Sequence, residues 1–143
     1  IKMLQTSLRV REDLRRCLEF GYQPELFLRE WMPIEPWREF RCILKAGELA
    51  GVTQVETSNP GRRAPSPDEA RSIADAIYAF FPEFKQACPL ETVVFDLVVT
   101  PDRDAPGGYA IQVMDLNPFG PETSTGLFRW GANDLDGSFR CFR

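Results

Sequence analysis

The sequence predicts an α+β fold with a mainly antiparallel sheet and packed helices, and three features point to it. A helix start lies at Ser66, two alternating runs are separated by Ala46–Gly47, and two further apolar runs flank the turn-rich segment Pro101–Gly108. With 143 residues, of which 43% are hydrophobic, the chain is long enough for one domain with its own core. We therefore expect a single domain over residues 1–143.

The N-terminal region is predicted to hold one helix and one strand. Apolar residues recur at nearly helical spacing through Leu8–Phe20, and Gly21 follows as a C-terminal cap. Glu25–Trp31 is predicted to be a strand, and Pro33 and Pro36 bracket the turn that follows it.

A β-hairpin is predicted next. Its strands are Glu39–Lys45 and Glu48–Val55, separated only by Ala46–Gly47. Because side chains alternate along a strand, the first run has two different faces. The face expected in the core holds Phe40, Cys42 and Leu44. The other face holds Glu39, Arg41, Ile43 and Lys45.

The second helix begins with a capping box. Ser66 is the N-cap, Pro67 lies in the first turn, and Glu69 follows three residues after the cap. Spacings of three and four then produce one apolar stripe, formed by Ala70, Ile73, Ala74, Ile77, Phe81 and Phe84.

The remaining strands are expected to form a second hairpin. Thr92–Thr100 is rich in valine, and Pro101–Gly108 joins it to a second strand, Tyr109–Asn117. The tail is predicted to be mostly loop, with two short candidates for regular structure, Leu127–Trp130 and Ser138–Phe142.

Composition excludes several classes of function. The net charge is −4, and 17 Lys and Arg are scattered among 21 Asp and Glu, so we expect no nucleic-acid partner. No apolar run approaches the ~18 residues of a membrane span, and we expect no membrane partner. Four widely spaced cysteines favour reduced thiols and the cytoplasm. The chain has no histidine, which argues against histidine-based triads and most catalytic zinc sites.

Oxygen ligands are concentrated in the two strands of the second hairpin. By alternation, Val113, Asp115 and Asn117 share one face, while Asp96 lies within an apolar run on the partner strand. We expect Asp96, Asp115 and Asn117 to bind Mg²⁺, which takes a few carboxylate and amide oxygens, and we expect this metal to be the chief balance for the Asp96 charge. The alternative is that Asp115 and Asn117 begin the turn at Pro118 and that Asp96 pairs with an arginine.

The charged face of the first hairpin strand is a candidate for nucleotide binding. Arg41 and Lys45 are potential phosphate donors, since arginine offers a planar fork to phosphate oxygens, and Glu39 is a potential ribose acceptor. The alternative is a solvated strand face with a Glu–Arg pair.

Several segments together resemble a known family: Phe27–Trp31, Glu39–Leu49 with Gln54, Val94–Asp96, Met114–Gly120 and Leu127–Trp130. This family is the cell division cycle protein 123 family, which belongs to the ATP-grasp superfamily, and the resemblance extends from Leu26 to Trp130. It implies an ATP-grasp-like lobe in which the nucleotide lies between two lobes. Because the chain begins just before the linking strand, we expect the N-terminal lobe to be missing or very short. Pro101–Gly108 departs from the family pattern as an extended hairpin loop.

The resemblance assigns a role to each candidate residue. The adenine-side linker would be Glu30, Trp31 and Met32. Glu39 would contact the ribose, and Arg41 would contact phosphate. We take Arg41 as the candidate catalytic residue, and the alternation of the strand adds Lys45 as a further candidate nucleotide contact. The metal ligands would be Asp96, Asp115 and Asn117.

Three functions follow as alternatives. The first is a ligase-like enzyme, in which Mg-ATP phosphorylates a carboxylate and an amine or thiol displaces the phosphate. The second is a nucleotide-dependent assembly factor with a protein client, because eukaryotic members of the family act as chaperones that assemble a heterotrimeric translation initiation factor. The third is a truncated, non-catalytic structural or docking fragment that binds no nucleotide.

Overall fold

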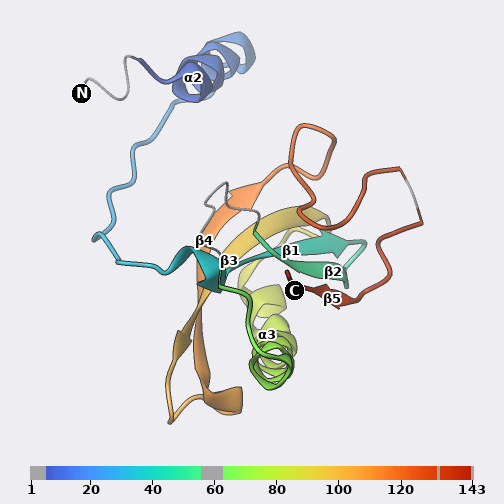
Figure 1. Ribbon diagram of the computed structural model, residues 1–143. Coiled ribbons are helices and arrows are strands. Elements are labelled where there is room, and N and C mark those ends of the chain that lie inside the picture. Colours follow the sequence, from blue (N-terminus) through green and yellow to red (C-terminus); the bar gives the residue numbers. More distant parts are fainter. Residues whose placement is uncertain (1–5, 56–62, 132, 143) are drawn as a thin grey trace. The chain divides into compact units, whose positions relative to one another are not determined.

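The computed structural model describes residues 6–55, 63–131 and 133–142. The chain divides into two compact units, Ile1–Met32 and Pro33–Arg143. Figure 1 shows that the second unit contains the whole sheet. The prediction of one domain over 1–143 stays a prediction.

The N-terminal unit contains helix α2, Leu8–Phe20, which confirms the predicted helix. Ser7 caps its start by accepting a hydrogen bond from the Val10 amide at 3.3 Å. Gly21 ends it in the left-handed conformation, with φ of 71°, which glycine adopts at little cost.

The predicted strand Glu25–Trp31 is wrong. Residues 22–35 form no helix or strand. Apolar side chains along it are exposed, including Phe27 at 81% and Trp31 at 89%. A strand is stabilised by hydrogen bonds to a neighbouring strand, and within the described residues no strand pairs with this segment.

The second unit is built on a mixed five-stranded sheet (Figure 1). In chain order its elements are η1 (Pro36–Arg38), β1 (Glu39–Lys45), β2 (Glu48–Gln54), α3 (Pro67–Ala87), β3 (Val93–Pro101), η2 (Pro106–Gly108), β4 (Tyr109–Asn117) and β5 (Phe139–Arg140). The strand order is β4-β3-β1-β2-β5. Only the β2–β5 pairing is parallel among these pairs, so the predicted α+β class with a mainly antiparallel sheet is confirmed.

Both predicted hairpins are present. In the turn between β1 and β2, Ala46 and Gly47 have φ of 50° and 79°, and positive φ at both central residues matches the twist of the flanking strands. β3 and β4 pair antiparallel along most of their length. In the tail, Ser138–Phe142 contributes the two-residue strand β5, whereas Leu127–Trp130 forms no helix or strand.

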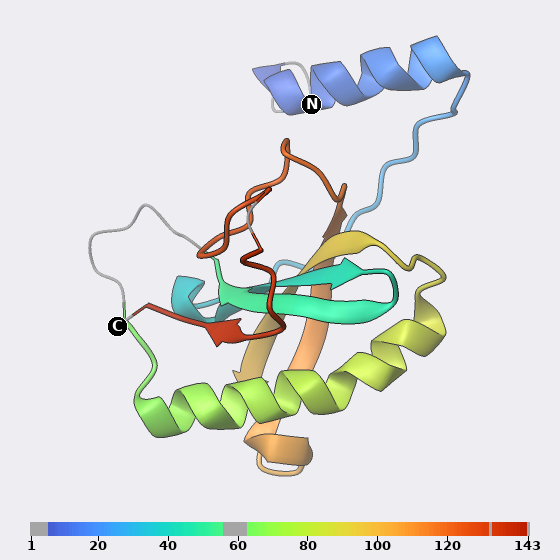
Figure 2. The ribbon, with the colours of Figure 1, turned by 90° about the vertical axis from the view of Figure 1, so that its right-hand side faces the viewer.

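α3 begins with the predicted capping box and covers one face of the sheet (Figure 2). The Ser66 hydroxyl accepts from the Glu69 amide at 3.2 Å, and the Glu69 carboxylate accepts from the Ser66 amide at 2.9 Å. The helix packs on the predicted core face of β1, and Phe84 stacks on Phe95 with ring centroids 3.9 Å apart. The core on this side includes Phe40, Cys42, Leu44, Ile73, Ile77, Leu97 and Val99.

The opposite face of the sheet is only partly covered. A smaller cluster of Ile43, Val94 and Phe128 lies there, with Phe119 and Trp130 packed against it. The tail therefore covers one part of this face. Within the described residues, no helix is long and apolar enough to cross a bilayer.

Candidate functional site

The centre of the site is an ion pair between neighbouring strands. Arg41 on β1 lies opposite Asp96 on β3. The guanidinium holds the carboxylate in a bidentate pair, with Nε–Oδ1 and Nη2–Oδ2 distances that are both 2.7 Å. The expectation that bound metal is the chief balance for the Asp96 charge is therefore wrong, and the alternative of arginine pairing is correct.

The pair is shielded from water but not sealed. The side chains of Arg41 and Asp96 are 15% and 20% exposed. Arg41 also donates from Nη1 to the carbonyl oxygen of Ser124 at 2.7 Å. Its hydrogen bonds to Asp96 raise the pKa of the guanidinium, and the Asp115 charge adds to this shift, although burial opposes it.

A β-bulge brings Asp115 to this face. Asp115 lies opposite Asp96, but Val113 lies opposite Leu97, so the register skips Met114. The prediction that Val113 shares a face with Asp115 is wrong, because simple alternation fails at the bulge and Val113 packs into the α3-side core.

Asn117 completes the cluster. Its Nδ2 donates to Asp96 Oδ2 at 3.1 Å, so the amide and the carboxylate share one face of the sheet. Asp115 is exposed, and its Oδ1 accepts from the Leu116 amide at 3.0 Å. The structure thus brings together Arg41, Asp96, Asp115 and Asn117.

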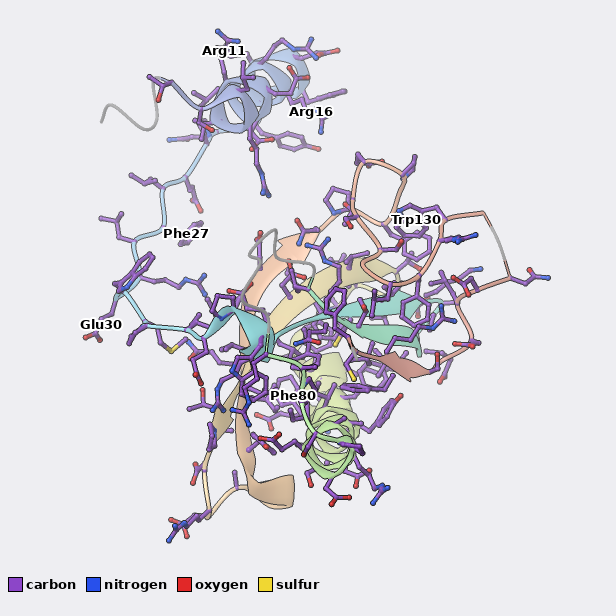
Figure 3. All side chains as sticks on the ribbon, viewed as in Figure 1. Arg11, Arg16, Phe27, Glu30, Phe80 and Trp130 are labelled. Atoms are coloured by element: carbon purple, nitrogen blue, oxygen red, sulfur yellow. The ribbon has the colours of Figure 1, made fainter. Side chains whose placement is uncertain are left out.

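The other predicted residues divide into three groups. Glu39 is half-buried on the face of Arg41, and burial, followed by the nearby Asp96 charge, raises the pKa of its carboxyl. Lys45 is exposed at the hairpin end of β1. It is four positions beyond Arg41, about 13 Å along a strand, so it lies outside the cluster. The linker candidates belong to the N-terminal unit, where Figure 3 labels Glu30; they are Glu30, Trp31 and Met32.

Comparison with known proteins identifies the family. A family model described as D123 matches residues 3–137. The chain belongs to the D123 family. The expected resemblance to the cell division cycle protein 123 family is thereby confirmed.

Relatives in the D123 family are longer than this chain. The translation initiation factor eIF2 assembly protein of Xenopus tropicalis is 36% identical over 107 residues, which cover 74% of this chain and 30% of that protein. Cell division cycle protein 123 of Yarrowia lipolytica is 29% identical over 133 residues, which cover 90% of this chain and 34% of that protein. The chain therefore spans about a third of the length of these relatives.

A solved member has the same fold. The structure of C-terminally truncated Cdc123 from Schizosaccharomyces pombe matches with a TM-score of 0.71 at 22% identity, over 99% of this chain and 59% of that one. This likeness supports the fold of the D123 chain.

The loop after β4 contributes contacts that sequence reasoning missed. Besides the Ser124 carbonyl, the Leu127 amide donates to the buried Thr53 hydroxyl at 3.1 Å. A Cβ on Gly126 would lie 2.6 Å from Thr53 Cγ2, so only glycine fits this approach. Trp130, labelled in Figure 3, packs edge-on against Phe119 with centroids 4.7 Å apart. The glycine was the available signal, although a close approach cannot be read from a single sequence.

The donor set of this cluster is of the kind that suits a hard cation that keeps several waters. Within residues 6–55, 63–131 and 133–142, no three His, Cys, Asp or Glu side chains are close enough to hold a metal by themselves. Each carboxylate oxygen has two lone pairs, so a bond from Arg41 leaves capacity on Asp96. Asn117 donates through nitrogen and retains an amide oxygen. Mg²⁺ commonly uses one or two carboxylates together with water and substrate phosphates.

Proposed function

We propose that this chain is the metal- and phosphate-binding part of an ATP-grasp type, Mg-ATP-binding protein that assists assembly of translation initiation factor eIF2 in the cytoplasm. The observation that carries the proposal is the half-open cluster around the Arg41–Asp96 pair. Asp96, Asp115 and Asn117 bring carboxylate and amide oxygens together beside the guanidinium of Arg41, with Glu39 on the same strand face. Such a site favours a divalent cation.

Each residue has a distinct role in this proposal. Asp96, Asp115 and Asn117 hold Mg²⁺, which neutralises phosphate charge when it is bound. Arg41 has five N–H groups and directs three of them at Asp96 and Ser124, which leaves two for phosphate oxygens. As the candidate catalytic residue, its task is positioning and charge stabilisation. Glu39 accepts from ribose hydroxyls.

The remaining assignments concern adenine and the protein client. Glu30, Trp31 and Met32 supply the adenine-side contacts. The names of the curated relatives support assembly of eIF2 as the cellular task. A ligase-like reaction is the second proposal. Both routes release phosphate, so mass spectrometry of purified eIF2 subunits incubated with the chain and Mg-ATP separates the two: a ligase leaves a covalently joined product, whereas an assembly factor does not.

Calorimetric titration with ATP, in the presence and absence of Mg²⁺, tests nucleotide binding. Because few protein ligands hold the metal, Asp115→Ala and Asn117→Ala should each weaken Mg-ATP binding at least tenfold, about 1.4 kcal/mol. Asp75→Ala is the matched control, since Asp75 is an exposed carboxylate on α3, which packs on the opposite face. Equal ATP affinity with and without Mg²⁺ would contradict the proposal. Absence of any binding would favour a docking fragment.

A second experiment tests whether eIF2 subunits are the protein client. Purified eIF2 subunits should bind the chain in size-exclusion chromatography, and Mg-ATP should change the affinity in the parent but not in Asn117→Ala. Retention of the nucleotide effect in this variant would separate the client function from the site.

A further inference from the structure

We propose a protein-docking groove between α3 and the β3–β4 hairpin, on the helix-covered side of the sheet, which takes an apolar side chain flanked by lysine or arginine. The proposal stands independently of nucleotide binding. Figures 1 and 2 show the hairpin extending from the sheet so that η2 lies against α3.

The hairpin tip is fixed on the helix by a close backbone approach. Gly107 has φ of 71°, and a Cβ at that position would lie 3.1 Å from the Cβ of Ala76. The tip thus rests directly on a small residue of α3. This contact fixes the spacing between α3 and the β3–β4 hairpin, which form the two walls of the groove.

The groove has a volume of about 220 Å³. Ala76, Ala79, Phe80 and Glu83 line one wall at spacings of three and four, which form a single stripe of α3. Phe80 is labelled in Figure 3. Tyr109 and Ile111 are among the residues on the hairpin wall. Small-molecule sites usually enclose about 300–1,000 Å³, so this groove better suits one or two side chains of a partner.

The charged residues in and near the groove indicate the kind of partner that it would bind. Glu83 is the charged residue among those that line the groove, and it is exposed. Asp75 lies next to Ala76 on α3, and Asp102 and Asp104 lie in the turn that leads into the hairpin wall. Arg103 lies between the last two of these carboxylates in the chain, so these five residues together carry a net charge of −3.

The nearest lysine on the helix does not neutralise these carboxylates. Lys85 Nζ donates to the Gly47 carbonyl at 2.6 Å, at the β1–β2 turn. A mostly apolar groove with the exposed Glu83 at its edge, and further carboxylates nearby in the chain, complements a basic and apolar segment, because charges at the edge of an interface steer and select partners. The occupant is therefore a segment of a partner protein with an aliphatic anchor and adjacent basic residues.

Amide NMR of the full chain tests this with three capped pentapeptides. The probe has leucine followed by lysine and arginine, and its controls have serine in place of leucine, or glutamate and aspartate in place of the basic pair. The probe should shift the signals of Ala79 and Ala110. The serine control should bind about tenfold more weakly, since the apolar anchor is lost, and the acidic control should leave those signals unchanged.

Substitutions in the protein provide a second test of the groove. Glu83→Gln should weaken the probe about two- to fivefold, as for loss of one exposed ion pair. Glu48→Gln, an exposed carboxylate on the other hairpin, should have no effect. The proposal is overturned if the acidic peptide shifts the same signals, if the probe moves none of them, or if Glu48→Gln and Glu83→Gln behave alike. Groove signals that move with protein concentration alone would identify a second copy as the occupant and would also overturn it.

Discussion

Asp96→Asn is the sharpest test of the ion pair at the centre of the site. Arg41 makes two 2.7 Å charge-assisted bonds to Asp96, and Asn117 adds a third bond at 3.1 Å. An asparagine retains one acceptor oxygen and directs an NH₂ group at donors. At least one charged hydrogen bond is then lost, each of which contributes about 1.5–3 kcal/mol.

The expected cost lies below that of breaking a fully buried pair. Complete burial makes removal of one partner cost about 3–5 kcal/mol, but here the two side chains are 15% and 20% exposed and Arg41 keeps its bond to Ser124. We therefore expect the free energy of unfolding to fall by about 2 kcal/mol, which lowers the Tm by about 8 °C for a domain of this size.

Urea and thermal unfolding, followed by circular dichroism, measure this change. Asp75→Asn, which removes an exposed carboxylate, should change stability by less than about 0.5 kcal/mol. Adding Arg41→Gln to Asp96→Asn should cost less than the sum of the single changes, because both remove the same interaction. An Asp96→Asn protein as stable as the parent would refute the reasoning, since it would mean that the carboxylate is poorly compensated.

Three further predictions concern the loop, the helix start and the site carboxylate. Gly126→Ala should cost about 2 kcal/mol, because φ is 62° and the new Cβ meets Thr53; unchanged urea unfolding would contradict this. Ser66→Ala should cost about 1 kcal/mol through loss of the cap, whereas Ser66→Asp should retain most of the stability. Glu39 has a folded-state pKa above its ordinary value of 4.5, so its contribution to stability is lost as pH rises through the folded pKa. Glu39→Gln should therefore gain stability relative to the parent as pH rises above the ordinary pKa of 4.5, and a difference independent of pH would argue against this shift.

Local signals in the sequence were sufficient for the main elements. The capping box at Ser66, the Ala46–Gly47 turn and the cap at Gly21 act within a few residues, and each appears in the structure where it was predicted. Glu25–Trp31 fails because a strand depends on a partner that the segment itself does not specify.

The sequence predicted which residues share this face of the sheet, but it did not predict the contacts between them. Asp115 and Asn117 share a face of the sheet with Asp96, as expected. The bulge at Met114, however, places Val113 on the other face. The Arg41–Asp96 pair joins residues 55 positions apart, and only the strand order β4-β3-β1 brings them together. Alternation identifies the face of a strand, whereas pairing across strands depends on tertiary register.

The most direct test of the proposed site is to locate the metal with Mn²⁺ in place of Mg²⁺. Both ions prefer octahedral oxygen ligands, and the paramagnetic ion broadens the NMR signals of nearby amides. With ATP present, we expect the amide signals of Asp96, Asp115 and Asn117 to broaden at lower Mn²⁺ concentration than those of Ile73 and Ile77 in α3, which packs on the other face of the sheet. Broadening centred on another part of the chain, or no broadening at saturating ATP, would contradict the assignment of this face as the Mg-ATP site.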